Sequence, residues 1–195
     1  VSHGTRKVGE AQLSIVSPET RSIDCLAHPF SASTPPEGFE AELVYVKQGY
    51  PDDYVGRDVR GKISLIEQGG NITLPEKAWF AEENGATAQI SINLGMARVL
   101  NLVQAKFRVW GNPTPATMEL LPKIPGISIT SEDGEQLKKL LERQTVRVRM
   151  KVNVGRKWDK ISEPVATIRG AIEPEKFVLL GGHLDGWYKG ATDNA

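Results

Sequence analysis

The order strand, helix, strand between residues 61 and 92 constrains the fold more than any other feature of this sequence. Residues 61–66 and 88–92 are short apolar runs, as expected of buried strands. Residues 75–84 between them are typical of a helix, because Pro75 suits the first turn and Gly85 suits a left-handed C-terminal cap. This order favours a right-handed parallel crossover. The sequence therefore predicts an α/β fold.

The segments on either side of this unit extend the same pattern. Residues 42–47 and 124–129 are further candidate strands, and residues 146–152 alternate with period two, as a half-exposed strand does. Ser131 is the expected N-cap of a helix that begins after residues 124–129. Its apolar stripe consists of Leu137, Leu140 and Leu141. On the earlier helix we expect Trp79 in the core, whereas residues 94–121 predict mostly irregular structure.

Composition excludes several classes of function. The 24 basic and 24 acidic side chains cancel, so the chain lacks the basic surface that nucleic acid or an anionic membrane requires. No apolar stretch approaches the roughly 20 residues of a membrane span, and the first residues contain no signal-peptide core. Cys25 is the single cysteine, which excludes an intrachain disulfide and a cysteine-based zinc cluster. We expect Cys25 to be a small buried hydrophobe.

The end of the sequence carries the residue types of a metal site. Residues 176–182 are an apolar run closed by two glycines, which predicts a strand, and ligands gather at strand ends in α/β sheets. His183 can bind a metal through a neutral imidazole, and Asp185 is close enough to hold the other ring nitrogen. Asp193 supplies a carboxylate, which can bridge two metal ions. A histidine and an aspartate two residues apart also occur by chance, as ordinary polar residues near a strand end.

The residues around this motif resemble a known family. Gly-Gly-His-Leu-Asp at 181–185, followed by Gly-Ala-Thr-Asp-Asn-Ala at 190–195, is similar to the first metal-binding segment of the di-zinc aminopeptidases and glutamate carboxypeptidases. The resemblance implies two Zn²⁺ ions, with His183 as a terminal ligand, Asp185 as the residue that orients it and Asp193 as the bridge. Trp187 and Tyr188 lie inside the motif, where lining a substrate pocket and simple packing are both open. The family's other ligands and its general base come later in the chain, so we expect an incomplete site and no activity in this chain alone.

A second resemblance covers the middle of the chain. Residues 56–92 and 124–137 are similar, in order, to a protease-associated (PA) domain, which the same family inserts just before the first zinc motif. The implied fold is a PA-type swivelling β/β/α domain plus partial strands of a zinc-peptidase α/β domain. The implied boundaries are an N-terminal peptidase-side segment (1–17), the PA domain (18–151), a linker (152–163) and the start of the peptidase domain (164–195).

Together the resemblances imply a hydrolase, a zinc metallopeptidase that acts near a chain terminus as an aminopeptidase or a carboxypeptidase. Its partners would be a peptide substrate, the remainder of the peptidase domain and a second copy in a possible homodimer. The PA domain would serve as a lid or a substrate-selection module, and the family favours a secreted, periplasmic or cell-surface location. Two alternatives stay open: a PA domain that binds peptides without catalysis, and an inactive peptidase homologue that serves as a receptor.

Overall fold

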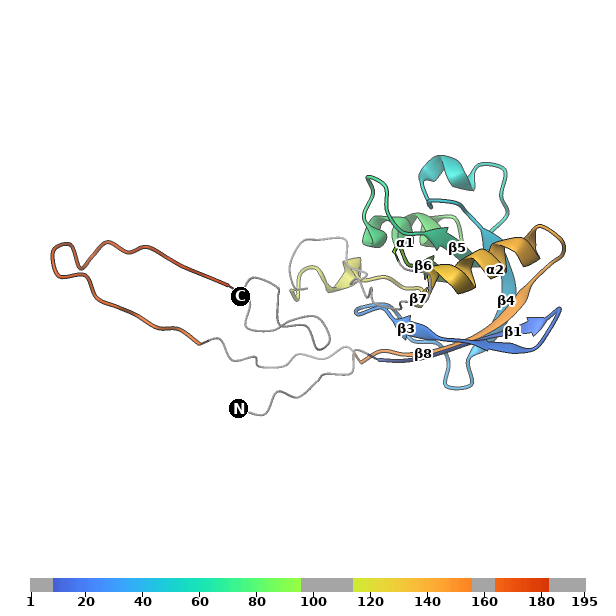
Figure 1. Ribbon diagram of the computed structural model, residues 1–195, viewed down its shortest axis with the longest axis horizontal. Helices are drawn as coiled ribbons and strands as arrows, with labels where there is room; N and C mark the ends of the chain where they lie inside the picture. The colour runs from blue at the N-terminus through green and yellow to red at the C-terminus, as the bar shows by residue number, and fades with distance from the viewer. Residues whose placement is uncertain (1–8, 96–113, 156–163, 183–195) are drawn as a thin grey trace. The chain divides into compact units, whose positions relative to one another are not determined.

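A computed structural model describes residues 9–95, 114–155 and 164–182, and all of its helices and strands lie in the first of two units, residues 1–157 and residues 158–195 (Figure 1). The first unit mixes strands with two α-helices, as the α/β prediction requires. The strands are β1 (Glu10–Ser17), β2 (Arg21–Ile23), β3 (Cys25–Ala27), β4 (Phe39–Tyr45), β5 (Ile63–Glu67), β6 (Ala88–Ile92), β7 (Gly126–Ile129) and β8 (Arg147–Asn153). The helices are α1 (Leu74–Glu83) and α2 (Ser131–Leu141), with the 3₁₀ helices η1 (Pro51–Tyr54) and η2 (Met118–Leu120).

The strands form one mixed sheet in the order β2-β1-β8-β4-β5-β6-β7-β3. Strands β4, β5, β6 and β7 are parallel neighbours, and β8 pairs antiparallel with both β4 and β1. Every residue of β6 is buried, whereas β8 alternates strictly between buried and exposed residues. Parallel strands covered on both faces and an antiparallel strand solvated on one face differ in this way. The predicted parallel arrangement of residues 61–66 and 88–92 is confirmed.

The two helices cover opposite faces of the parallel strands. Leu137 of α2 belongs to a core with Leu65, Ile90 and the inward side chains of β8, whereas Leu74 and Ala81 of α1 pack with Ile66 in a second cluster. Consecutive residues of β5 therefore point into different cores, as period-two alternation requires. Burying a leucine or isoleucine side chain contributes about 1.5–3 kcal/mol to stability relative to leaving it exposed.

Two details of the helices differ from the sequence prediction. The N-cap of α2 is Thr130, whose Oγ1 accepts a hydrogen bond from the Asp133 backbone at 3.1 Å, so the prediction of Ser131 as cap is wrong by one residue. Both residues have hydroxyls, and only the backbone conformation distinguishes them. Trp79 is half-buried and outside both cores, because the inward side of α1 is formed by its neighbours Lys77 and Ala78. The left-handed cap at Gly85 is present, with φ +82°.

Strand β1 joins the N-terminal residues to the rest of the sheet. It pairs with β8 from Glu10 opposite Asn153 to Ser17 opposite Arg147. Leu13 and Ile15 point into the main core and are almost completely buried. Residues 10–17 are therefore part of the same sheet as strands within residues 18–151. The assignment of residues 1–17 to the peptidase side of a domain boundary stays a prediction.

Residues 164–182 of the second unit contain neither a helix nor a strand, so the strand expected at 176–182 is not formed. Its apolar side chains are exposed, including Phe177 at 85% and Leu180 at 90% of their surface. A strand needs hydrogen-bonded neighbours and an apolar surface to pack against. Neither is provided by the part of this unit that the structure describes.

Candidate functional site

The proposed metal-binding residues lie outside the described part of the chain. His183, Asp185, Trp187, Tyr188 and Asp193 all follow residue 182, and their roles remain predictions. Among residues 9–95, 114–155 and 164–182, no three histidine, cysteine, aspartate or glutamate side chains gather as a metal group.

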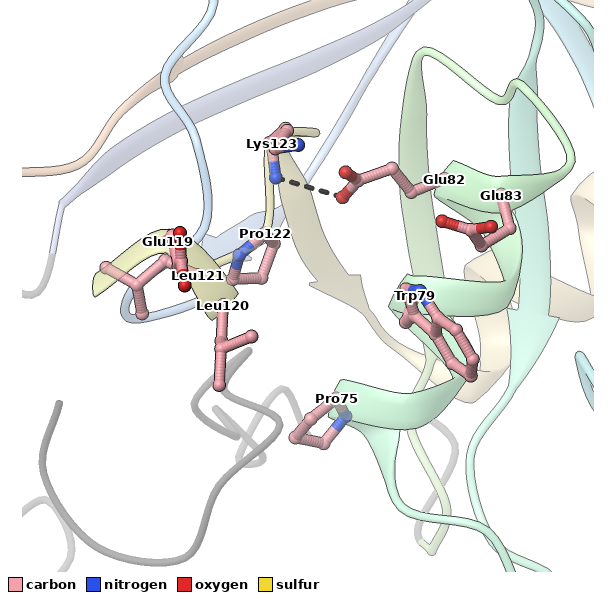
Figure 2. Close-up of a pocket in the computed structure, with 9 residues that line it drawn as sticks. All are labelled: Pro75, Trp79, Glu82, Glu83, Glu119, Leu120, Leu121, Pro122 and Lys123. Atoms are coloured by element: carbon pink, nitrogen blue, oxygen red, sulfur yellow. Dashed lines mark hydrogen bonds between the residues drawn. The ribbon is translucent and has the colours of Figure 1, made fainter. Parts of the chain in front are cut away.

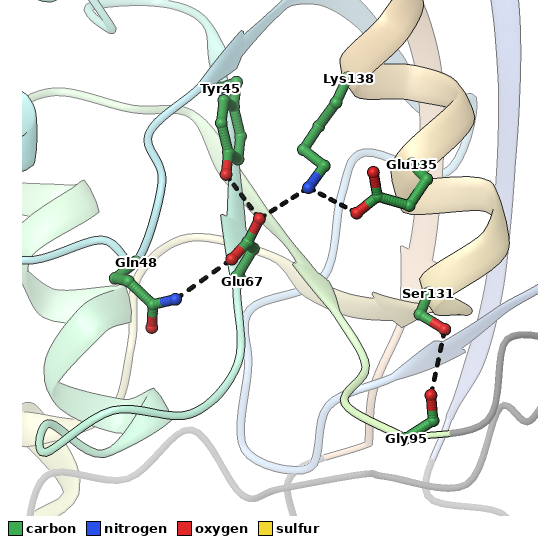
Figure 3. A network of polar contacts seen from close by, with 7 residues as sticks. All are labelled: Tyr45, Gln48, Glu67, Gly95, Ser131, Glu135 and Lys138. Atoms are coloured by element: carbon green, nitrogen blue, oxygen red, sulfur yellow. Dashed lines mark hydrogen bonds and ion pairs between the residues drawn. The ribbon is translucent and has the colours of Figure 1, made fainter.

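The described residues do place a polar cluster at the carboxyl ends of the parallel strands β4 and β5 (Figure 3). Glu67 ends β5, and its Oε1 accepts hydrogen bonds from Tyr45 Oη at 2.6 Å and Lys138 Nζ at 2.8 Å. Its Oε2 accepts a third from Gln48 Nε2 at 3.1 Å. Lys138 also pairs with Glu135 on α2 and lies 5.5 Å from the centroid of the Tyr45 ring. The cluster therefore ties α2 to the ends of two strands.

Charge and hydrogen bonding fix the protonation states in this cluster. Burial acts to raise the pKa of Glu67, but the hydrogen bonds from Lys138, Tyr45 and Gln48 outweigh it, so the pKa lies below its usual value. Burial, together with the bond to Glu67, raises the pKa of Tyr45 to about 12. For Lys138, burial opposes the charge, but the bonds to Glu135 and Glu67 raise its pKa above the usual range. Glu67 is thus an ionised carboxylate with three hydrogen bonds at neutral pH, which suits a structural role rather than that of a general base. We call Glu67 with its partners Tyr45, Gln48 and Lys138 the Glu67 clamp.

A fully buried lysine lies under the loop that follows β5. Lys77 of α1 has no exposed surface, and its Nζ donates to the carbonyl oxygens of Glu67 at 3.0 Å and Gly69 at 2.7 Å. Its ammonium also lies 5.4 Å from the centroid of the Tyr50 ring. Burial lowers the pKa of Lys77, while Asp53 and Glu67 oppose this shift. The ammonium replaces water as the donor to both carbonyls and so fixes the path of the loop.

Buried polar side chains continue between the sheet and this loop. Ser128 on β7 accepts or donates a hydrogen bond with His28 Nε2 and accepts one from Gln68 Nε2 at 3.3 Å. Gln68 also donates to Asn93 Oδ1 at 3.2 Å. All four side chains are at most 2% exposed. His28 and Ser128 are hydrogen-bonded to each other, but both are completely buried. A substrate therefore cannot reach them, which argues against a catalytic role for this pair.

Sequence reasoning missed both the clamp at Glu67 and the buried Lys77. Lysine and glutamate side chains are usually exposed. In addition, no local pattern marks Glu67 and Lys138 as partners, because 71 residues separate them in the sequence. A glutamate at the last position of an apolar strand is the one signal that the sequence offers. The expectation of a buried Cys25 holds only in part, because its side chain is partly buried against the main core. Burial, with the charge of Asp24 adding to it, raises the pKa of its thiol to about 12, so it stays protonated.

Comparison with known proteins identifies the family. Residues 39–137 match the PA domain, which is half of the chain, and this span contains the parallel strands β4, β5, β6 and β7, all of α1 and most of α2. The chain belongs to the PA domain family, and the PA resemblance is confirmed.

The relatives are exopeptidases by name. Carboxypeptidase Q of Rattus norvegicus is 30% identical over 190 residues, and that of Bos taurus is 31% identical over 193 residues. Both alignments cover 95% of this chain but 40% of the relative, so the chain spans about two fifths of the length of these curated proteins. A probable glutamate carboxypeptidase of Zea mays is 26% identical over 209 residues and covers 85% of this chain and 29% of that protein.

Solved structures agree on the fold. A zinc aminopeptidase from Bacillus subtilis superposes with a TM-score of 0.59 at 32% identity, covering 75% of this chain and 30% of that one. A peptidase M28 precursor from Shewanella amazonensis gives a TM-score of 0.66 over 93% of this chain and 43% of that one, at 22% identity, which supports the fold alone.

The described helices include none that is long and apolar enough to cross a bilayer.

Proposed function

We propose that this chain is the PA-containing portion of a di-zinc exopeptidase. The observation that carries the proposal is the succession, in one chain, of a PA domain and the motif of residues 181–195. Relatives named carboxypeptidase Q and a zinc aminopeptidase of similar fold support the same class. The substrate is a peptide, cleaved near one of its ends. The family resemblance also favours a secreted, periplasmic or cell-surface location and a homodimer.

The residues of the motif have distinct roles in this proposal. His183 would bind one zinc through an imidazole nitrogen, and Asp185 would accept the hydrogen bond of the other ring nitrogen and so fix the tautomer. Asp193 would supply the carboxylate that the family resemblance implies for both ions. Bound zinc supplies a Lewis acid that polarises the scissile carbonyl and activates water. One imidazole and one carboxylate fall short of the usual three protein ligands of a catalytic zinc, so this chain alone hydrolyses no peptide.

The PA domain acts as a lid or a substrate-selection module of the enzyme. Such a role requires a surface that keeps its shape, and the Glu67 clamp and the buried Lys77 give the strand ends and their loop several bonds each. Trp187 and Tyr188 are candidates for lining the substrate pocket, since they lie between the two metal-binding halves of the motif.

Release of terminal amino acids by the protein with its complete peptidase domain tests the proposal. Replacing Asp193 with alanine should abolish turnover, because the bridge between the zincs is lost. Asp185→Asn should reduce metal affinity or activity by roughly 10–100-fold. Wild-type turnover in Asp193→Ala would make the alternative of a non-catalytic peptide-binding module, or an inactive receptor, the better account.

A further inference from the structure

The end of α1 contains the one place in the sequence where glycine follows asparagine, at Asn84 and Gly85. Asparagine is among the thermolabile residues of proteins, because the peptide nitrogen of the next residue can attack its side-chain amide. Glycine has no Cβ to shield that nitrogen. Asn84 is exposed, so water reaches its side chain. The pair therefore has the chemical composition of a deamidation site.

Deamidation of this pair passes through a cyclic imide and needs only water and hydroxide. Hydroxide removes the proton of the Gly85 peptide nitrogen, and that nitrogen forms a bond to Asn84 Cγ. The side-chain nitrogen takes a proton from water, which returns hydroxide, and leaves as ammonia. Water then opens the imide at either carbonyl. One opening leaves aspartate, and the other leaves isoaspartate, in which the main chain runs through the side-chain carbons.

The fold keeps the two reacting groups of this pair apart. Asn84 Nδ2 donates to the Phe80 carbonyl oxygen at 2.8 Å, which directs the side-chain amide toward the preceding turn. The ψ angle of Asn84 is 3°, so the Gly85 nitrogen lies beside the Asn84 nitrogen rather than beside Cβ, and ring closure requires a large rotation. The Gly85 N–H donates to the Glu82 carbonyl oxygen at 2.9 Å, which opposes loss of its proton. Glu82 is itself held, since its Oε2 accepts a hydrogen bond from the Lys123 backbone at 3.0 Å (Figure 2).

Two further backbone bonds hold the cap of α1 in this conformation. The Ala86 N–H donates to the Ala81 carbonyl oxygen at 2.9 Å, which completes a Schellman motif around Gly85, where φ is +82°. The Gly85 carbonyl oxygen accepts a hydrogen bond from the Gly61 N–H at 2.9 Å, so the cap is also bonded to the turn before β5. The reactive geometry is therefore reached only after several bonds of the cap break together.

We propose that Asn84 is a latent deamidation site, closed while the C-terminal cap of α1 is formed and opened by local unfolding of that cap. Helix ends are among the segments that open at the lowest free energy. Isoaspartate adds one atom to the main chain, which displaces Gly85 from its bonds to Glu82 and Gly61 and so makes the opening permanent. The site lies in the PA domain and does not depend on the zinc motif, so its failure would leave the exopeptidase proposal untouched.

The test is mass spectrometry of the 195-residue chain and of two blocked peptides, residues 80–88 and 67–75, after incubation in the same mildly alkaline buffer. Peptides of this length form no stable helix and supply the unstructured rates. In the peptides Asn84 should react faster than Asn71, because the β-branched side chain of Ile72 shields the attacking nitrogen. In the folded chain Asn84 should react at least about tenfold more slowly than in its peptide, since the reaction waits for the cap to open. Equal rates of Asn84 in chain and peptide, or no reaction of the peptide, would overturn the proposal.

Two glycine variants separate opening of the cap from unfolding of the whole domain. Ala81→Gly lowers the helix propensity of the last turn of α1 and should speed the reaction of Asn84 at least about threefold. Gln136→Gly makes the same kind of change on the exposed side of α2 and should alter this rate less than about 1.5-fold. Equal acceleration in both variants would overturn local opening as the route. The isoaspartate product, separated by ion exchange, should melt at a lower temperature than Asn84→Asp, which lacks the extra main-chain atom, and equal melting temperatures would overturn the permanent loss of the cap.

Discussion

Replacing Glu67 with glutamine tests whether the clamp at the strand ends stabilises the PA domain. Glutamine keeps the shape of the side chain but removes the charge, and its amide turns one acceptor oxygen into a donor. The bond to the Lys138 ammonium, at 2.8 Å, is the main loss. A hydrogen bond to a charged group contributes about 1.5–3 kcal/mol when buried. Because the Glu67 and Lys138 side chains are 29% and 20% exposed, we expect about 1–2 kcal/mol.

The same variant should change the pH dependence of stability. The pKa of Glu67 in the folded protein lies below its unfolded value, so its contribution is present above the unfolded pKa, near 4.3, and is lost as the pH falls through the folded pKa. The difference in unfolding free energy between wild type and Glu67→Gln should therefore be largest at neutral pH. It should shrink progressively below about pH 4.3.

Urea unfolding of the 195-residue chain at several pH values measures both effects. A double-mutant cycle with Lys138→Met isolates the pairwise energy, and Glu142→Gln at the exposed C-cap of α2 is the control. The control should change stability by less than about 0.5 kcal/mol. A neutral-pH stability of Glu67→Gln equal to wild type, or a loss that stays constant down to pH 3, would refute the reasoning.

Two further variants test the packing and the start of α2. A Cβ at Gly134 would lie 2.4 Å from Ile92 Cγ2, so the overpacking in Gly134→Ala should destabilise the fold by about 1–3 kcal/mol. The better helix propensity of alanine offsets up to about 1 kcal/mol of this loss. The control Gln136→Ala, on the exposed side of α2, should change stability by less than about 0.5 kcal/mol. Thermal unfolding checks this, and a more stable Gly134→Ala protein would contradict the packing. Thr130→Ala should cost about 0.5–2 kcal/mol because the cap is lost, whereas Ser131→Ala should be close to neutral; the reverse order in urea unfolding would return the cap to Ser131.

The elements that sequence reasoning predicted are those whose patterns are local. The unit β5-α1-β6 has its strand runs, its proline and its capping Gly85 within about thirty residues, and β8 shows its alternation in seven. The pairings that it could not predict join distant segments. β1 pairs with β8 and β3 with β7, in each case across a hundred residues or more, and register between such segments is decided by packing.

The metal-binding residues were predicted from a sequence motif, so their residue types could be predicted but their positions in space could not. His183 and Asp193 are residue types that bind zinc, and their spacing has meaning through a family resemblance. Lys77 shows the converse case: a lysine in a helix predicts an exposed side chain, and its burial depends on two carbonyl oxygens that only the folded loop brings together.

Zinc content tests the central claim most directly. The protein with its complete peptidase domain, after dialysis, should retain two zinc ions per chain, measured by elemental analysis with the protein concentration determined in parallel. His183→Ala should lose the zinc that it holds, and Asp193→Ala should lose at least one, whereas Glu142→Gln should retain both. Wild-type protein without zinc, or unchanged zinc content in both His183→Ala and Asp193→Ala, would contradict the assignment of residues 183–193 as a metal-binding segment.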